Sequence, residues 1–515
     1  MLQIQHLSIF HKKDLTDLIR DFSFVLNPGD KAVIVGEEGN GKSTLLKLLV
    51  DPALVDAYAE YAGDIRLRGE VVGYLPQELP EEDREKTLYT FFSEVPFFSD
   101  ASPRDLADMA GAFGLTVDFF YSDQTLGTLS GGEKIKAQLA RVLLQKPTLL
   151  LLDEPSNDLD IDTLRWLERY LGACPLPVLF VSHDETLIER VANVVIHLEK
   201  VRKKTVPRHT VARMPYRQYI DERLSAFARQ EQLARKGQDE YDRKMAKYRQ
   251  IEQKVEHQQH AISRQDPSGG RLLKKKMHAV KSMGRRFERE AEDMTQMPDT
   301  EDAILLRFQG SVPVPRGKTV IDLALPELTI DGRVLARNLR LHAAGGEKLC
   351  LIGRNGVGKT TLLRHIADGL LARADIHAGY MPQNYEDRLA KEKTAVGFLA
   401  VTGFKDETTK IRTWLGSMKF TAEEMERPIA ELSGGQKAKL FFLKMNLDGA
   451  NVLLLDEPTR NFSPLSNPVI REVLGAFSGT ILAVSHDRAF MRDVCETVLE
   501  LTPEGLVPVD RERLG

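Results

Sequence analysis

The stretch that decides the fold is GEEGNGKST, residues 36–44, which follows the apolar run KAVIV at residues 31–35. A Gly-x4-Gly-Lys-Ser/Thr loop between a strand and a helix cradles phosphate, because its glycines let backbone N–H groups approach the phosphate oxygens. The arrangement returns as GRNGVGKTT, residues 353–361, after the apolar run KLCLI at residues 348–352. Two such loops predict two α/β domains of one type.

Four further motifs follow each loop in the same order. Short strand-like runs end in Pro-Gln at Gln77 and Gln383, and each is followed by LSGG, DEP and VSHD in turn. From LSGG onward the matching residues are 303 positions apart, so this part of the repeat has no net insertion. The loop lysines are 317 positions apart, which places about a dozen extra residues in the first repeat before its Pro-Gln.

The residue types at these positions are those that phosphate chemistry needs. Lys42 and Lys359 are expected to hold the β- and γ-phosphates. An apolar run that ends in Asp-Glu reads as a buried strand that delivers carboxylates at its carboxyl end. The aspartates, Asp153 and Asp456, would then bind Mg²⁺.

The glutamates and histidines that follow complete the predicted chemistry. Glu154 and Glu457 would polarise the attacking water, a role that requires an ionised carboxylate. His183 and His486 each follow a predicted strand, 29 residues after these glutamates. A single histidine at a strand end is more often structural, but its repetition at one spacing favours a γ-phosphate-sensing role.

The LSGG motif, residues 129–132 and 432–435, carries a family resemblance. The sequence resembles the ATP-binding cassette superfamily, over residues 2–219 and 303–514. The resemblance implies two P-loop cassettes, each a RecA-like core with a helical subdomain, that sandwich two ATP molecules with Mg²⁺. A monomer is then expected, because both halves of the sandwich belong to one chain.

The resemblance assigns each site to residues of both repeats. The expected ATP contacts are Gly36, Gly39, Asn40, Gly41, Lys42, Ser43, Thr44, Gln77, Ser130, Gly131, Gly132, Gly353, Asn355, Gly356, Gly358, Lys359, Thr360, Thr361, Gln383, Ser433, Gly434 and Gly435. The expected Mg²⁺ ligands are Ser43, Gln77, Asp153, Thr360, Gln383 and Asp456. The catalytic residues would be Glu154, Glu457, His183 and His486. In each site, the loop of one repeat faces the LSGG of the other.

Two positions depart from the family pattern. Ser463 stands where the first repeat has Asp160, in a loop that normally couples the two sites, so the sites are expected to be unequal. Phe10 is a candidate for stacking on adenine in the first repeat, with a core role as the alternative. The matching residue of the second repeat is Ile330, which has no aromatic ring.

Between the repeats lies a helical linker. Residues 220–298 are rich in Gln, Glu, Lys and Arg, and apolar residues recur at steps of three and four on both sides of the break DPSGG, residues 266–270. The first arm has Tyr241, Met245, Tyr248, Ile251 and Val255, and the second has Leu273, Met277, Val280, Met283, Phe287, Ala291 and Met294. We expect a hairpin of two antiparallel helices, roughly 45–60 Å long, between cassettes at 1–219 and 299–515.

The hairpin tip, residues 264–289, is strongly basic. Its net charge is +7, although the whole chain carries −4, so the remaining residues sum to −11. A basic tip on an acidic body favours a local contact with nucleic-acid backbone over an incidentally charged helix face. The residues expected to contact RNA are Arg271, Lys274, Lys275, Lys276, Lys281, Arg285 and Arg286.

Two cassettes joined by such a linker resemble the ABC-F family of translation factors. YRQYI at residues 216–220 is similar to the lead-in of that family's linker, without its glycine. The resemblance implies a ribosome-binding ATPase whose linker contacts large-subunit rRNA, P-site tRNA and the peptidyl-transferase region. Some members confer antibiotic resistance by ribosome protection, whereas others act on stalled or idle ribosomes.

Other classes of cassette protein fit the sequence less well. A transporter ATPase would have a short connection between its tandem cassettes, and no run here approaches the ~20 apolar residues of a membrane span. DNA-repair and chromosome-structuring ATPases carry zinc cysteines or far longer coiled coils. Ribosome-recycling proteins carry a cysteine-rich iron–sulfur region, whereas the three cysteines of this chain are far apart in the sequence. The N-terminus has no signal-peptide pattern, so a cytoplasmic protein is expected.

Overall fold

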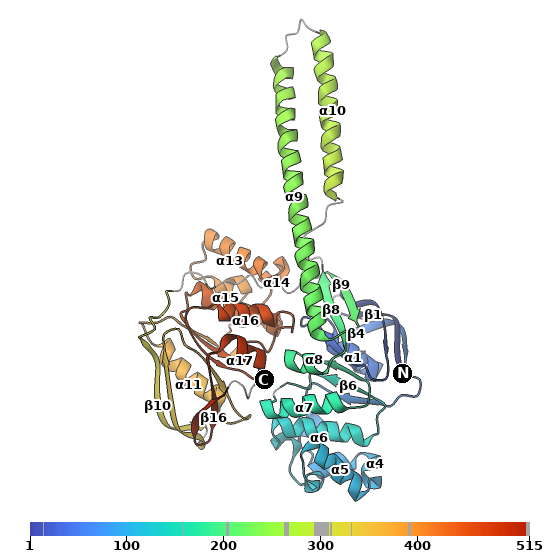
Figure 1. Cartoon of the computed structure of the whole chain (residues 1–515), viewed down its shortest axis with the longest axis vertical. Coiled ribbons are helices and arrows are strands. Elements are labelled where there is room, and N and C mark those ends of the chain that lie inside the picture. The colour runs from blue at the N-terminus through green and yellow to red at the C-terminus, as the bar shows by residue number, and fades with distance from the viewer. Residues whose placement is uncertain are drawn as a thin grey trace. The chain divides into compact units, whose positions relative to one another are not determined.

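The computed structural model describes residues 1–13, 15–157, 159–201, 205–261, 267–292, 308, 312–330, 332–389 and 393–510. The chain divides into two compact units, Met1–Tyr216 with Glu301–Gly515, and Arg217–Thr300. The first unit contains both repeats and the second contains the linker helices (Figure 1). No helix among the described residues is long and apolar enough to cross a membrane.

A six-stranded sheet forms the centre of the first repeat. Its strands, in spatial order, are β5 (Val72–Leu75), β6 (Leu149–Asp153), β7 (Val178–Val181), β3 (Lys31–Val35), β8 (Val194–Val201) and β9 (Val206–Ala212). The first five are parallel, and β9 pairs antiparallel with β8. Every residue of β3, β6 and β7 is buried, because these apolar runs are covered on both faces of the sheet.

The second repeat has a sheet with the same strand order. Its strands are β13 (Ala378–Met381), β14 (Val452–Asp456), β15 (Thr480–Val484), β12 (Lys348–Ile352), β16 (Thr497–Thr502) and β17 (Gly505–Val509). Five are again parallel, and the last is antiparallel. The prediction of two α/β domains of one type is therefore confirmed. In both sheets, the strand after which the glycine loop begins lies inside the sheet, so the loop opens at the carboxyl edge where ligands bind.

A smaller antiparallel sheet accompanies each large one. In the first repeat it has the order β2 (Asp17–Leu26), β1 (Leu2–His11), β4 (Ala59–Arg66), and in the second it pairs β10 (Thr319–Ile330) with β11 (Arg333–Ala344). Strand β4 lies before the first Pro-Gln, where the first repeat has its extra residues. The insertion detected in the sequence is thus an added edge strand.

Helices cover both faces of the sheets. In the first repeat they are α1 (Lys42–Val50), α2 (Glu81–Arg84), α3 (Leu88–Ser93), α4 (Pro96–Asp100), α5 (Pro103–Phe113), α6 (Gly131–Leu144), α7 (Ile161–Ala173) and α8 (Glu185–Val191). In the second they are α11 (Lys359–Leu371), α12 (Ala395–Leu399), α13 (Lys405–Ser417), α14 (Ala422–Glu426), α15 (Gly434–Leu447), α16 (Asn467–Gly475) and α17 (Arg488–Val494). The helices between the Pro-Gln and LSGG motifs form the helical subdomain of each repeat.

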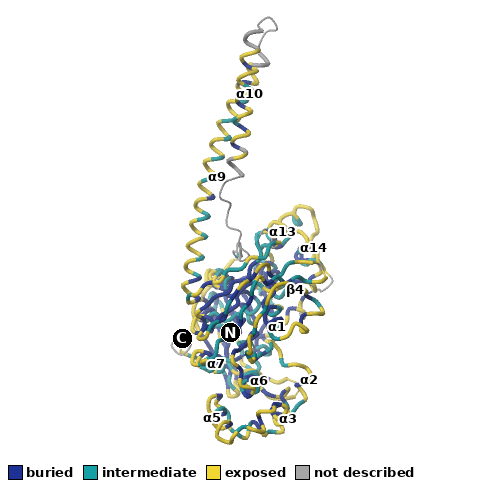
Figure 2. The backbone as a smooth tube through the Cα atoms, turned by 90° about the vertical axis from the view of Figure 1, so that its right-hand side faces the viewer, coloured by how far each residue is buried: buried dark blue, intermediate teal, exposed yellow. Residues whose placement is uncertain are grey.

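The second unit is a pair of long helices. Helix α9 (Tyr216–Ala261) has 46 residues and α10 (Pro267–Glu292) has 26, and the two run antiparallel (Figure 1). The rings of Tyr248 and Phe287 meet edge to face, with centroids 6.5 Å apart. Val255 and Val280 are also buried, whereas most of both helices is exposed (Figure 2). The predicted helical hairpin is confirmed, but α9 is longer than predicted, at about 69 Å.

The prediction for Ile251 was wrong, because its side chain is 43% exposed. The packed face of α9 passes from Tyr248 to Val255, and between them Glu252 rather than Ile251 is half-buried. The Tyr248 hydroxyl donates to Glu252 Oε1 at 2.8 Å. One side of a helix stays against a partner helix when its packed residues are spaced alternately four and three positions apart. Here the packed residue after Tyr248 is four positions on, at Glu252, and the next is three further, at Val255. Arg264, Asp266 and Met294 and the side chain of Ala291 lie outside the described residues.

Candidate nucleotide sites between the repeats

Both glycine loops end with a left-handed glycine at the start of a helix. Gly41 (φ 86°) precedes α1, and Gly358 (φ 103°) precedes α11. A Cβ at Gly41 would lie 3.2 Å from Leu18 Cβ, and one at Gly358 would lie 2.9 Å from Leu335 Cδ1. Glycine is therefore required by backbone conformation and by packing. The free N–H groups of each helix N-terminus are suited to bind phosphate.

The loop lysines fold back over their own loops. Lys42 Nζ donates to the carbonyl oxygens of Gly36 (2.8 Å) and Glu37 (3.0 Å). Lys359 Nζ donates in the same way to Gly353 (2.7 Å) and Arg354 (3.1 Å). Burial lowers the pKa of Lys359, and the neighbouring carboxylates oppose this shift. Both ammonium groups are thus held inside a loop that phosphate would enter.

Buried aspartates lie at the carboxyl ends of β6 and β14. Asp153 and Asp456 are 0% and 1% exposed, and burial raises the pKa of each to about 6. Ser43 Oγ donates to Asp153 Oδ1 at 2.9 Å. Within the described part of the chain, Asp153 Oδ2 and both carboxylate oxygens of Asp456 have no hydrogen-bond partner. A buried carboxylate without partners is costly, so these oxygens and the nearby hydroxyls fit Mg²⁺, which prefers carboxylate, phosphate and water oxygens.

In the first repeat, the glutamate and histidine form a direct pair. His183 Nε2 lies 2.9 Å from Glu154 Oε1, and His183 Nδ1 donates to the carbonyl of Phe462 in the second repeat at 2.8 Å. Burial alone would raise the pKa of Glu154, but the charge and hydrogen bond of His183 hold it below its usual value. Glu154 has a left-handed φ of 51°, a strained conformation that persists at functional sites. This carboxylate is therefore held in its ionised form.

In the second repeat, the equivalent pair is looser. His486 Nε2 lies 3.7 Å from Glu457 Oε1, and the His486 backbone N–H donates to Glu457 Oε2 at 3.3 Å. Burial, together with the charge of Asp456, raises the pKa of Glu457 to about 8. Burial, together with Lys359, lowers the pKa of His486 to about 3. Glu457 has the same strained backbone, with φ 50°. The two repeats therefore present the same residues in different charge states.

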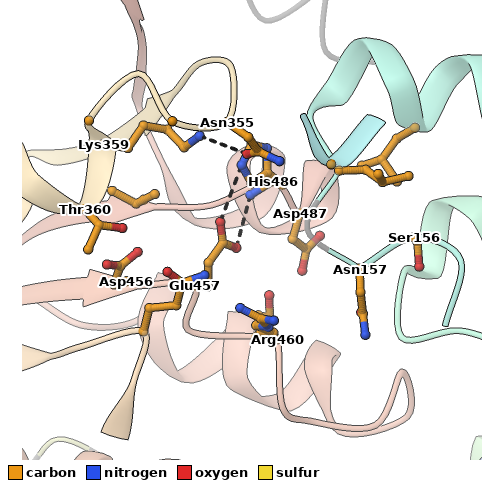
Figure 3. Close-up of a pocket in the computed structure, with 18 of the residues that line it drawn as sticks. Ser156, Asn157, Asn355, Lys359, Thr360, Asp456, Glu457, Arg460, His486 and Asp487 are labelled. Carbon is orange, nitrogen blue, oxygen red and sulfur yellow. Dashed lines mark hydrogen bonds and ion pairs between the residues drawn. The ribbon is translucent and has the colours of Figure 1, made fainter. Parts of the chain in front are cut away.

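A cavity of about 720 Å³ lies between the repeats. Figure 3 shows the side chains of Lys359, Thr360, Asp456, Glu457 and His486 on one side of it and those of Ser156 and Asn157 from the first repeat on the other. Its lining includes these predicted site residues: Asn355, Gly356, Gly358, Lys359, Thr360, Thr361, Gln383, Asp456, Glu457, His486 and, from the first repeat, Gly131 and His183. The structure thus brings Gly131 of the first LSGG to the same cavity as the second glycine loop.

Several residues that line this cavity were not predicted from the sequence. Arg460 and Arg333 line it, as do Ser156, Asn157 and Lys134 from the first repeat. The repeat offset offered a signal for Arg460, because it aligns this arginine with Asn157 two residues after the DEP motif. Ile330 also lines the cavity, at the place where an aromatic base-stacking residue is expected. Gln77 is exposed after β5.

The family model described as "ABC transporter" matches the chain twice, over residues 19–157 and 336–460. The two matches together cover more than half of the 515 residues. The chain belongs to the ATP-binding cassette family. Its repeats are therefore ATP-binding cassettes, and the protein is an ATPase.

Relatives of the ABC-F type match this chain over nearly its whole length. The "Tylosin resistance ATP-binding protein TlrC" of Streptomyces fradiae is 28% identical, over 95% of this chain and 95% of its own length. The "ATP-binding protein Uup" of Escherichia coli (strain K12) is 29% identical, over 90% of this chain and 75% of its own. The "ABC transporter F family member 5" of Arabidopsis thaliana is 26% identical, over 94% and 72% respectively.

A solved structure shares the fold of the tandem cassettes. The archaeal ribosome recycling factor aABCE1, solved with the ribosomal stalk protein aP1, superposes with a TM-score of 0.57 and 17% identity. The match covers 98% of this chain and 90% of the recycling factor. At this identity the likeness concerns the fold alone.

In the other site, carboxylates of the first glycine loop contact the second cassette. Glu38 Oε2 accepts a hydrogen bond from the Gly435 backbone N–H at 3.2 Å, at the start of α15 in the second LSGG. The residues at these positions of the second loop are Arg354 and Asn355, so the acidic pair belongs to the first cassette alone. The first loop thus lies against Gly434 and Gly435, with a carboxylate at an N–H group that a phosphate could use.

Ser463, the residue that departs from the family pattern, takes part in this contact together with Ser466. Ser466 Oγ donates to Glu37 Oε1 at 2.8 Å, and Ser463 Oγ lies 3.4 Å from the same oxygen. In the first cassette the equivalent residue, Asp160, caps α7 by accepting from the Thr163 backbone N–H. An aspartate at position 463 would oppose the Glu37 carboxylate, whereas a serine hydroxyl can donate to it. This accounts for the departure from the family pattern.

The basic residues predicted to contact RNA are exposed wherever the structure describes them, and all of these lie on α10. They are Arg271, Lys274, Lys275, Lys276, Lys281, Arg285 and Arg286. Leu273 and Val280, two apolar residues of the same helix, are buried. The charges therefore face away from the packed side of the helix, where they are open to a polyanion.

Proposed function

We propose that this ATPase binds the ribosome and that its hairpin contacts the RNA backbone of large-subunit rRNA and P-site tRNA. The observation that carries the proposal is the exposure of seven basic side chains on one hairpin helix of an otherwise acidic protein. Long-range contact with phosphate backbone needs clustered cations, whereas base stacking needs exposed aromatic rings. The ABC-F relatives, which match along nearly the whole chain, support the same proposal.

The proposed cycle uses the cassettes as a clamp. With ATP held by Lys42 and Lys359, each LSGG helix closes over the nucleotide bound to the opposite cassette. Glu154, which is ionised, orients water for hydrolysis at its site, and Glu457 does so at the other site once it has lost its proton. His183 and His486 contact the γ-phosphate. Mg²⁺, when bound by Asp153 and Asp456 with the adjacent hydroxyls, neutralises phosphate charge. Hydrolysis opens the clamp and releases the ribosome.

The proposed contact is tested by neutralising part of the tip. We expect the Lys274→Gln, Lys275→Gln, Lys276→Gln variant to bind ribosomes less tightly, with a salt dependence reduced by about two to three units of log Kd per log salt. Pelleting with purified ribosomes at several salt concentrations measures both quantities. A matched control removes three exposed lysines from the cassettes, Lys13, Lys405 and Lys410, and keeps the same net charge. Equal affinities for the two variants would overturn the role of the tip.

A second candidate function is protection of the ribosome from antibiotics that bind the large subunit. The match with the tylosin resistance protein, which spans 95% of both chains, favours it. Expression in a susceptible bacterium should raise the inhibitory concentration of a macrolide such as tylosin, and the lysine variant should not. An unchanged inhibitory concentration across large-subunit drugs would leave the housekeeping role.

A further inference from the structure

Two buried ion pairs join the cassettes. Arg488, the first residue of α17, donates from both Nη atoms to Glu168 of α7, and the Nη1–Oε2 distance is 3.3 Å. Arg471 of α16 contacts Glu185, the first residue of α8, at 2.9 Å. All four side chains are at most 10% exposed. Both contacts lie beside the helices that follow His183 and His486.

These four residues occupy only two positions of the repeat. The offset of 303 that relates His183 to His486 also relates Glu168 to Arg471 and Glu185 to Arg488. The first cassette therefore carries glutamate at both positions, and the second carries arginine at both. The two ion pairs are the same contact, formed twice with opposite polarity.

A third position is inverted in the same way. Arg190 donates to Glu168 at 2.7 Å within the first cassette. Its equivalent, Asp493, accepts from Arg471 at 2.9 Å within the second. Each cassette thus keeps an internal pair, and the sign of all three charges changes together. Such a matched change preserves the fold of each cassette while reversing the charge that it presents to its partner.

The inversion of charge is important because a cassette could otherwise pair with the same cassette of a second chain. Two first cassettes would place Glu168 against Glu185 in both contacts, and two second cassettes would place Arg471 against Arg488. Buried like charges strongly oppose association, whereas opposite charges fix register and partner. Specificity of this kind rests on rejection of the wrong partner as much as on attraction of the right one.

We propose that these inverted charges decide which cassettes pair. The partner that fits the charged face of the first cassette is a second cassette, and like cassettes from separate chains are rejected. Within one chain the covalent link gives the correct partner a high effective concentration, so the protein is a monomer with one internal sandwich. The proposal does not depend on what the hairpin binds.

The test uses full-length variants in which one cassette receives the charges of the other. The all-basic variant carries Glu168→Arg, Glu185→Arg and Arg190→Asp, and the all-acidic variant carries Arg471→Glu, Arg488→Glu and Asp493→Arg. Combining all six substitutions restores every pair with reversed polarity. Each triple variant should lose ATPase activity by about tenfold or more, and the six-fold variant should return to within about twofold of the wild-type rate.

The two triple variants also complement each other. Each should sediment as a monomer alone, and an equimolar mixture should form a dimer whose ATPase rate exceeds the sum of its components. Circular dichroism and thermal unfolding of each variant detect misfolding, and the Glu168→Gln, Glu185→Gln variant removes attraction without adding repulsion. Wild-type activity in both triple variants, failure of the six-fold variant to recover, or a mixture that stays monomeric would overturn the proposal. None of these outcomes bears on ribosome binding.

Discussion

At the scale of single residues, the two nucleotide sites differ in the charges nearest to the phosphates. Glu154 is paired with His183 at 2.9 Å and ionised, whereas burial raises the pKa of Glu457 to about 8. Glu38 accepts a hydrogen bond from the second LSGG, and its equivalent, Asn355, carries no charge. We therefore expect the sites to be unequal because of the residues around each phosphate position.

Replacing Glu38 by asparagine, the residue of the second loop, should strengthen nucleotide binding at the site of the first loop. The change removes a carboxylate that competes for the Gly435 N–H and repels phosphate, so an increase of roughly tenfold in affinity is expected. Titration with a fluorescent, non-hydrolysable ATP analogue resolves the two sites. The mirror substitution, Asn355→Glu, should weaken the other site. Unchanged affinities in both variants would contradict this explanation.

Replacing Glu185 by glutamine should change how stability depends on pH. Burial raises the pKa of Glu185 from its ordinary 4.5 to about 7, against the attraction of Arg471. A raised carboxyl pKa means that its stabilising contribution is present below pH 4.5 and is lost as pH rises through about 7. The glutamine variant lacks this loss, so the difference in free energy of unfolding between the two proteins should change by about 3 kcal/mol between pH 4.5 and 8. Parallel pH profiles from denaturant unfolding would show that Glu185 does not titrate in this way.

At the scale of elements, the hairpin shows what periodicity predicts and where it fails. The steps of three and four identified both helices and the buried positions Val255, Leu273, Val280 and Phe287. They misplaced Ile251, because a step of three and a step of four from Tyr248 are both compatible with a helix, and only the partner helix selects one. Helix α9 begins at Tyr216, four residues before the predicted start of the linker, and Pro215 directly before it is a signal for a helix start.

The aromatic contact should control hairpin stability. Phe287→Ala removes the ring that packs against Tyr248, at a cost of about 2–3 kcal/mol. Backbone amides of α9 and α10 should then exchange hydrogen roughly 30- to 100-fold faster, without change in the cassette sheets. Leu272→Ala, at a side chain that is 57% exposed, is the matched control. Equal exchange in the two variants would show that this contact does not hold the helices together.

At the scale of the whole molecule, duplication was the strongest signal in the sequence. Five motifs in the same order predicted two domains of one type and the positions of the glycine loops, because local motifs specify local structure. Contacts between the cassettes gave no such signal. The Glu38–Gly435 hydrogen bond and the Glu168–Arg488 pair join residues more than 300 positions apart, and only the assembled cassettes bring them together.

The most direct test of the central claim is sedimentation of cell extract that contains the Glu154→Gln, Glu457→Gln variant. Without its water-orienting carboxylates, this variant should bind ATP, remain closed and hydrolyse slowly. We expect it to travel with ribosomes in a sucrose gradient when ATP is present and to leave them when ATP is withheld. If it stays at the top of the gradient in both conditions, or pellets with membranes, the ribosome-binding function is wrong and a transporter ATPase becomes the better explanation.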